Sequence, residues 1–286
     1  MDDFETIPPA QPLMPDPLEP PCPTCGEGAD TGAVTPVYAI GRIEARFPRL
    51  AVEKEFAQAT GRADMAGRTD RQAFHEALSD RANRYLLRKL CWVMSVQGLE
   101  TYLLQPRELA DLDLLVEAIR PRPGPLDLDV VIGMRGPIAP PGMCNGLMLP
   151  IVALDQIYSF DRDSLIKAIP PAHTGQELAP AAEQVLDLIL HMTDNAGATD
   201  EHRALNYLAV RYPALYVTAA EKFGQNLALT AVDVRPSALG GTRRILEVIL
   251  TFTHRNTDVA EKMFTRVDMT EEFPFLVTKM SPYYHH

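Results

Sequence analysis

Residues 244–253 read RILEVILTFT, and this stretch decides the fold class that we predict for the second half of the chain. Apolar side chains alternate in it with Glu or Thr, which is typical of a β-strand that buries one face. The alternating apolar positions are Leu246, Val248, Leu250 and Phe252. Three neighbouring segments also have strand-like composition and are separated by turn-forming residues: 229–234, 263–269 and 275–280. Together they predict an antiparallel sheet.

Two helices are expected ahead of this sheet. Residues 178–192 carry apolar side chains at helical spacing, and a second amphipathic stretch runs from about 199 to 223. Thr199 is the expected N-cap of the second helix, since Asp200 and Glu201 follow it in the first turn. Pro213 should kink that helix in its middle. The sequence therefore predicts an α+β layer, with two helices packed on one face of a small antiparallel sheet.

The first half of the chain, residues 34–170, reads as a domain of mixed structure. We expect helices over 49–58, 70–97 and 108–119, the second of which contains Trp92 and ends at Gly98. Strands are expected in four segments: 37–40, 101–104, 128–134 and 148–154. A linker over 170–177 would separate this domain from a C-terminal domain at 178–284.

Residues 1–33 form a tail of different composition. They hold eight of the 25 prolines, and residues 1–30 carry seven acidic residues without a single Lys or Arg. Such a segment forms neither helix nor sheet by itself. The net charge of −11 therefore belongs mostly to the tail, and the remaining chain has no basic stripe of the kind that nucleic-acid binding requires.

Composition also limits where the protein works. No run of apolar residues is long enough to span a membrane, and the acidic N-terminus lacks the layout of a signal peptide. The chain has four cysteines, which are too few for a disulfide framework. We therefore expect a cytoplasmic protein that binds neither membranes nor nucleic acid. His285 and His286 at the C-terminus are either native or the remnant of a tag.

The sharpest local motif is Cys22-Pro-Thr-Cys25-Gly26 in the tail. Two thiolates on one such knuckle are typical ligands of structural zinc, which needs four in total. A second chain could complete the set, and so could residues elsewhere in this one: His75, Cys91, Cys144 and His173. A redox pair, or two cysteines without a special role, are the other interpretations of the motif.

Four further residues are candidates for binding a peptide or a partner. Arg203, Asn206 and Tyr207 follow each other on the second C-terminal helix, where Arg203 and Tyr207 share a face. They would grip a peptide, or else they pair with acids and cap the core. Cys144 lies in a Gly- and Pro-rich loop that can line a cleft, whereas Cys91 is expected to pack as a small core residue.

Several segments together resemble the C-terminal region of unknown function in PatG-type cyanobactin maturation proteases. They recur in order and with matching spacing over roughly residues 34–284: 37–41, the Trp92 segment leading to 101–106, 150–160, 203–207, 266–270 and 273–275. No serine-protease constellation can be placed in the sequence, so the resemblance implies the pathway and not the protease activity. It also supplies no catalytic residues for this region.

The resemblance implies an accessory protein of ribosomal peptide natural-product biosynthesis that binds a precursor peptide or a partner enzyme. A peptide can add itself to an exposed edge strand of the C-terminal sheet. The alternative is a metal-dependent peptide-modifying enzyme that uses Cys22 and Cys25 or the Cys144 loop. A structural homodimer is the third hypothesis.

Overall fold

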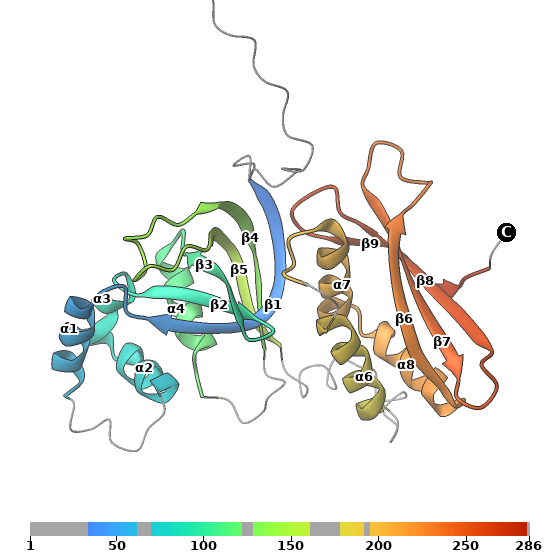
Figure 1. Ribbon diagram of the computed structural model, residues 1–286, viewed down its shortest axis with the longest axis horizontal. Helices are drawn as coiled ribbons and strands as arrows, with labels where there is room; N and C mark the ends of the chain where they lie inside the picture. The colour runs from blue at the N-terminus through green and yellow to red at the C-terminus, as the bar shows by residue number, and fades with distance from the viewer. Residues whose placement is uncertain (1–33, 62–69, 122–127, 161–177, 192–194, 285–286) are drawn as a thin grey trace, which may run out of the picture. The chain divides into compact units, whose positions relative to one another are not determined.

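The computed structural model describes residues 34–61, 70–121, 128–160, 178–191 and 195–284 (Figure 1). The predicted tail and the predicted linker at 170–177 lie outside these ranges. The described residues belong to one compact unit. Among the described helices, none is long and apolar enough to cross a membrane.

Five strands of the first half close into a barrel in the order β1-β2-β3-β5-β4. The strands are β1 (Thr35–Arg46), β2 (Cys91–Val96), β3 (Leu99–Gln105), β4 (Leu128–Ile138) and β5 (Pro150–Phe160). All neighbours are antiparallel except β3 and β5, which run parallel. The long strand β1 closes the barrel because its first half pairs with β4 and its second half with β2. Gly41 lies at this changeover, where a Cβ would collide with the carbonyl oxygen of Ser95.

Helices α1 (Leu50–Thr60), α2 (Asp70–Ser79) and α4 (Leu109–Ala118) confirm most of the predicted helices of the first half. The predicted helix over 70–97 is wrong beyond Ser79. A short 3₁₀ turn, η2 (Arg81–Asn83), and one turn of helix, α3 (Arg84–Leu87), lead from α2 into strand β2.

The physical reason is a change of period inside that stretch. Trp92, Met94 and Val96 face the barrel core, whereas Val93 between them joins a different cluster, which is the alternation of a strand. Gln97 and Gly98 then form the turn to β3 with positive φ angles of 52° and 81°. Gly98 therefore ends a strand and not a helix.

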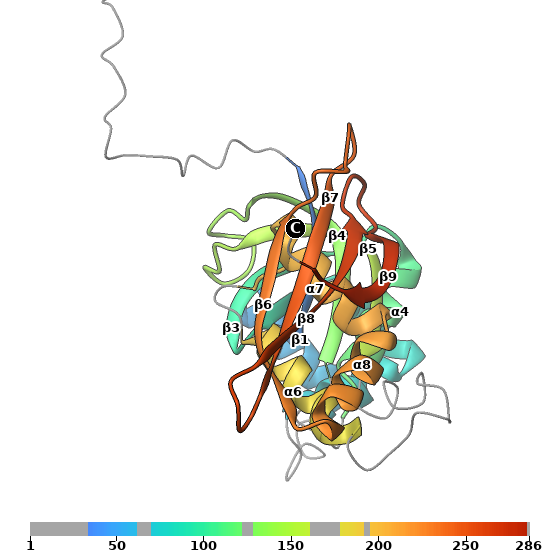
Figure 2. The ribbon, with the colours of Figure 1, turned by 90° about the vertical axis from the view of Figure 1, so that its right-hand side faces the viewer.

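The second half is α+β, as predicted. Its elements are α6 (Leu178–Leu190), α7 (Asp200–Arg211), α8 (Ala214–Gly224), and the strands β6 (Leu227–Pro236), β7 (Ile245–His254), β8 (Ala260–Asp268) and β9 (Phe275–Pro282). The strands form an antiparallel sheet in sequence order, with the helices on one face (Figure 2). Thr199 caps α7 as expected, since its hydroxyl accepts a hydrogen bond from the His202 amide at 3.2 Å.

Pro213 divides the second predicted helix into α7 and α8 instead of only kinking it. Proline has no amide hydrogen to donate, and it stands here as the N-cap of α8. The described part of the second half therefore has three helices where the sequence indicated two.

The core of the second half extends onto the barrel. Leu246, Val248, Leu250 and Phe252, the alternating residues of β7, pack against the helices, and the same cluster includes Tyr38 and Ile40 of β1 and Val130 and Ile132 of β4. A separate cluster fills the barrel around Trp92. The two halves of the chain are therefore joined by a shared hydrophobic core.

Candidate peptide-binding site

Arg203 on α7 holds the loop that leads into β9. Its side chain is fully buried, and its guanidinium donates hydrogen bonds to the carbonyl oxygens of Glu271 at 2.7 Å and Glu272 at 2.6 Å. The same group pairs with Asp200 at 2.9 Å, and Asp200 also pairs with Arg244 at 2.8 Å. Burial lowers the pKa of Arg203, and the nearby Asp200 carboxylate opposes that shift. The arrangement fixes the backbone immediately before β9.

Strand β9 is an edge of the sheet, with β8 on one side and no further strand paired with it among the described residues (Figure 2). Three apolar side chains in and before it are exposed: Phe273 to 51%, Phe275 to 64% and Val277 to 37%. Leu276 and Met280, between and after them, pack toward the core. The β9 edge, which we define as residues 273–280, thus presents apolar side chains beside an open strand, which is an arrangement that accepts another strand.

One backbone amide on the β9 edge already has a hydrogen-bond partner. The Met280 amide donates a hydrogen bond to the hydroxyl of Tyr212 at 2.8 Å. The register between β8 and β9 also shifts near Arg266, and such irregularities weaken unwanted edge pairing. An added strand is therefore best accommodated at the N-terminal half of β9, next to Phe275 and Val277.

Two carboxyl groups meet below the loop that precedes β9. Glu272 lies beside Asp155 of β5, and Asp155 forms an ion pair with Arg107. One buried oxygen of each acid has no hydrogen-bond partner among the described residues, and the same is true of the Arg203 Nε. Burial and the Asp155 carboxylate raise the pKa of Glu272 to about 7, while Arg107 and Arg203 oppose the shift. A proton shared by the two acids would satisfy both oxygens.

Asn206 and Tyr207 join α7 to the barrel. The Asn206 side chain is buried and donates to the carbonyl oxygen of Tyr38 at 2.8 Å and to the Asn195 amide oxygen at 3.1 Å. The Tyr207 ring packs edge-on against the Tyr38 ring, with 6.3 Å between their centroids. Burial raises the pKa of Tyr38, whose hydroxyl bonds to that of Tyr158. Both predicted binding residues therefore contact β1, away from the β9 edge.

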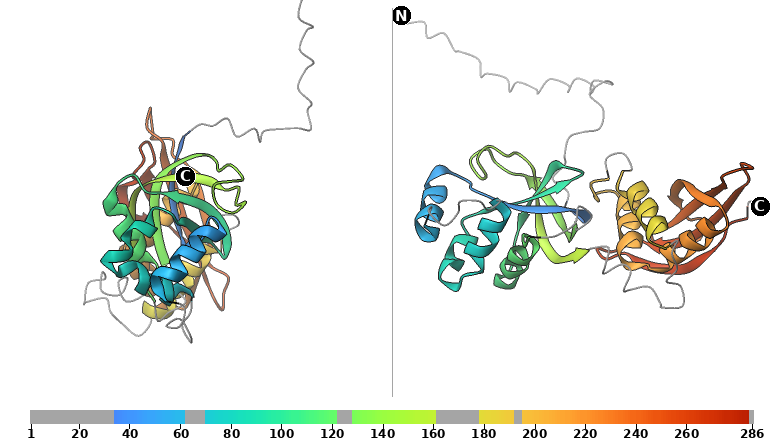
Figure 3. Two further views of the ribbon diagram at one scale, coloured as in Figure 1. Left: turned by 90° about the vertical axis from the view of Figure 1, so that its left-hand side faces the viewer. Right: turned by 90° about the horizontal axis from the view of Figure 1, so that it is seen from below.

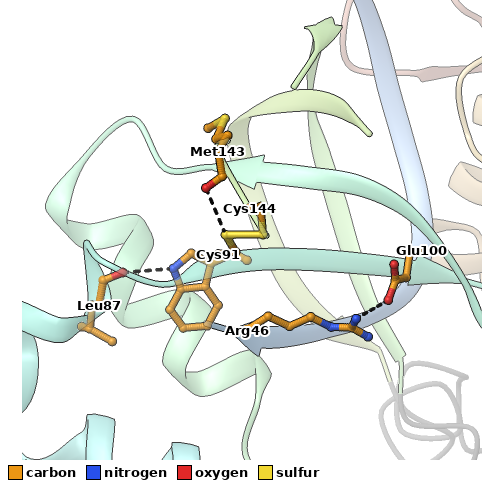
Figure 4. The surroundings of a disulfide bond; sticks show 7 residues. Arg46, Leu87, Cys91, Glu100, Met143 and Cys144 are labelled. Atoms are coloured by element: carbon orange, nitrogen blue, oxygen red, sulfur yellow. Dashed lines mark hydrogen bonds and ion pairs between the residues drawn. A yellow bond between two sulfur atoms is a disulfide. The ribbon is translucent and has the colours of Figure 1, made fainter. Parts of the chain in front are cut away.

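Cys144 and Cys91 form a disulfide, which the sequence analysis did not expect (Figure 4). Cys91, at the start of β2, packs partly buried against a small hydrophobic cluster, but as a bonded cysteine and not as the free core thiol that was expected. Both cysteines line a cavity of about 510 Å³ together with Met143 and Trp92. Cys144 does line a hollow, as its loop suggested, but it is not brought together with Arg203, Asn206 or Tyr207.

The predicted zinc ligands Cys22 and Cys25 lie outside the described residues, as does His173. Of the proposed completions, Cys91 and Cys144 are bonded to each other, and His75 is on α2. Within the described ranges, no three His, Cys, Asp or Glu side chains cluster in a way that can hold a metal ion.

The sequence predicted the strand over 275–280 and an edge strand of the C-terminal sheet as a peptide acceptor, but not which strand is the open edge or that Phe273, Phe275 and Val277 are exposed on it. Phe273 entered only through the resemblance, and Glu272 and Asp155 were not predicted as site residues. A usable signal was present: the last strand of an antiparallel meander is an edge, and aromatic residues on it are exceptional. The pairing of Glu272 with Asp155 has no sequence signal, because the two acids come from different halves of the chain.

Residues 172–283 match the family model described as PatG C-terminal. The similarity to the C-terminal region of PatG that the sequence suggested is thereby confirmed for the second half of the chain.

A solved structure titled "PatG Domain of Unknown Function" has the same fold, with a TM-score of 0.69 and 19% sequence identity. The match covers 87% of this chain and 98% of that one, so the fold likeness includes the barrel as well as the second half. No curated protein matches the chain.

Proposed function

We propose that this chain is an accessory, non-catalytic protein of cyanobactin-like ribosomal peptide biosynthesis, which binds a precursor peptide or a partner enzyme along the β9 edge. The observation that carries the proposal is the open strand β9 with Phe275 and Val277 exposed beside it. An extended peptide would gain backbone hydrogen bonds from the strand and apolar contacts from these two side chains.

The pathway part of the proposal is supported by the PatG C-terminal match and by the fold likeness to the PatG domain. The binding part is supported by the way Arg203 holds the start of β9. A loop that is fixed by a buried arginine loses little conformational entropy on binding, and pre-organisation of this kind favours affinity.

The test is a titration of the labelled precursor peptide of the same gene cluster into the full chain, followed by fluorescence anisotropy. The double variant Phe275→Lys/Val277→Lys should weaken binding at least about tenfold, because lysine side chains on an edge disfavour strand addition and remove the apolar contacts. A purified partner enzyme from the cluster replaces the peptide in a second titration.

The matched control is Leu239→Lys/Val259→Lys. These residues are 71% and 60% exposed and lie outside β9, so the same chemical change should leave the affinity unaltered. Equal affinity of the β9 double variant and the native protein for both the peptide and the enzyme would contradict the proposed site. A mass change of the peptide after incubation with this protein alone would contradict the non-catalytic role.

Structural zinc on Cys22 and Cys25 in a cytoplasmic protein is part of the same proposal. Tightly bound zinc that chelators remove only together with unfolding would support it. The double variant Cys22→Ser/Cys25→Ser should then lose the metal, which elemental analysis of tag-free protein measures. If the native chain is purified without chelators and still contains no metal, this part of the proposal is contradicted.

A further inference from the structure

A second hollow, apart from the β9 edge, is lined by residues from the end of β1 and from α1 and α2. Figure 3 shows these three elements side by side. The volume of this hollow is about 990 Å³. Phe47, Phe56 and Phe74 form an aromatic floor, with ring centroids 4.9 to 5.3 Å apart. Phe56 belongs to the barrel core, and Phe47 and Phe74 are partly buried against that core.

The walls of this cavity are basic in a protein whose net charge is −11. Four arginines line it, Arg42, Arg46, Arg49 and Arg71, against two glutamates, Glu44 and Glu53. Positive charge concentrated in a hollow with low-dielectric walls attracts anions more strongly than the same charge spread over a surface.

Three of these arginines differ in the partners that they already have within the protein. Arg71 donates to the carbonyl oxygens of Ile43, Ala118 and Arg120 at 3.3, 2.6 and 3.1 Å, which fixes its positive charge in the wall. Arg46 pairs with Glu44 at 3.1 Å and with Glu100 of β3, the strand on the other side of β2 (Figure 4).

Arg49 differs from both, because it is exposed and makes no ion pair within the described ranges. It is also the N-cap of α1, and its own side chain caps none of the first amide groups of the helix. A carboxylate at this point would meet both a guanidinium and the positive end of the helix dipole.

We infer that this cavity binds an acidic peptide segment in which a carboxylate side chain stands next to an aromatic or large aliphatic one. The apolar side chain would pack on the Phe47–Phe56–Phe74 floor while the carboxylate pairs with Arg49. The charge and the aromatic floor select side chains, whereas the β9 edge selects an extended backbone, so this site does not depend on the function proposed for β9.

The experiment is isothermal titration of the full chain with four capped tripeptides: acetyl-Glu-Phe-Glu-amide, acetyl-Gln-Phe-Gln-amide, acetyl-Glu-Ala-Glu-amide and acetyl-Lys-Phe-Lys-amide. The first should bind at least about tenfold more tightly than the others, and its affinity should fall several-fold when the salt concentration rises from 50 to 500 mM. In Arg49→Glu its affinity should fall at least about tenfold.

Arg88→Glu is the matched control, because Arg88 is an exposed arginine outside this cavity. It should leave the affinity for the first peptide unaltered, as should Phe275→Lys/Val277→Lys. The milder variant Arg49→Gln, with an unchanged melting temperature, should also weaken binding and so excludes a folding defect. The inference is overturned by absence of heat at millimolar peptide, by equal binding of the Glu and Gln peptides, or by equal losses in Arg49→Glu and Arg88→Glu.

Discussion

Gly197 fits the segment before α7 against β1 at a point where no larger residue is tolerated. Its φ is +73°, its carbonyl accepts the Tyr38 amide hydrogen bond at 2.9 Å, and a Cβ would collide with the Tyr38 carbonyl oxygen. The residue therefore combines a left-handed backbone with a close approach between two parts of the chain.

We expect Gly197→Ala to lower the free energy of unfolding by about 3 kcal/mol or more, because backbone strain and a collision act together. Two other glycines separate these effects. Gly146 has a φ of +88° and open space around its Cβ position, so Gly146→Ala should cost about 1 kcal/mol. Gly142→Ala, with neither constraint, should stay within about 0.5 kcal/mol. Urea denaturation measures all three, and equal losses at the three sites would contradict the collision.

Glu272 should make stability depend on pH. Burial and the Asp155 carboxylate raise its pKa from the ordinary value of 4.5 to about 7 in the folded chain. The folded state therefore holds more protons between these values, and its stability falls as the pH rises through this window. Glu272→Gln should remove that loss. Between pH 5 and pH 8 the free energy of unfolding of the variant should therefore rise relative to that of the native protein by on the order of 1 kcal/mol. Partial exposure of Glu272 to water keeps this difference below the value that the full pKa shift would give.

Thermal unfolding at pH 5, 6, 7 and 8, followed by circular dichroism, tests this difference. Glu271→Gln is the control, because its side chain is exposed and lies one position away. A constant difference between Glu272→Gln and the native protein at all four pH values would show that Glu272 does not titrate in this range.

At the scale of elements, the Cys91–Cys144 disulfide ties the start of β2 to the loop between β4 and β5. It closes a loop over a sequence separation of 53 residues. In the chain-entropy model a bond over such a loop stabilises the fold by about 4 kcal/mol. We expect Cys91→Ser/Cys144→Ser to lower the free energy of unfolding by this amount. The native protein should lose the same amount in a reductant, and the double variant should be insensitive to it.

Denaturation with and without reductant distinguishes stabilisation by the disulfide bond from an effect of cysteine side-chain packing. An equal response of the native protein and the double variant to reductant would mean that the bond contributes nothing. The disulfide also changes the role of Cys144, since a bonded sulfur is not a nucleophile. Any thiol chemistry at this loop first requires reduction.

For the whole molecule, the shared core predicts a single unfolding transition. Tyr38 and Ile40 of the barrel pack in the same cluster as the helices and sheet of the second half. The chain has one Trp, Trp92, and it reports the barrel core. Its fluorescence and the hydrogen exchange of β7 should therefore show coincident midpoints in urea.

Leu208→Ala, which truncates a buried side chain of α7, should shift both midpoints together by about 2–4 kcal/mol of stability. Asp233→Ala on the exposed part of β6 should shift neither appreciably. Two separate midpoints in the native protein would contradict a shared core and favour independent unfolding of the two halves.

The sequence alone determined the elements whose signals are local. The alternation in residues 244–253, the Thr199 cap and the α+β class of the second half follow from side-chain period and capping chemistry within a few residues. The prediction of one helix over 70–97 was wrong because helical spacing at the start of this stretch passes directly into strand alternation at its end.

Only the tertiary structure decided what brings distant residues together. The disulfide between Cys91 and Cys144, the hydrogen bond from Arg203 to Glu272, 69 residues away, and the meeting of Asp155 with Glu272 depend on how the barrel and the sheet fold. Arg203 illustrates the difference. The spacing of residues along the sequence predicts that Arg203 lies on a helix, but it does not predict the buried contact with the loop before β9. Spacing shows which side chains share a face of the helix and not which part of the chain covers that face.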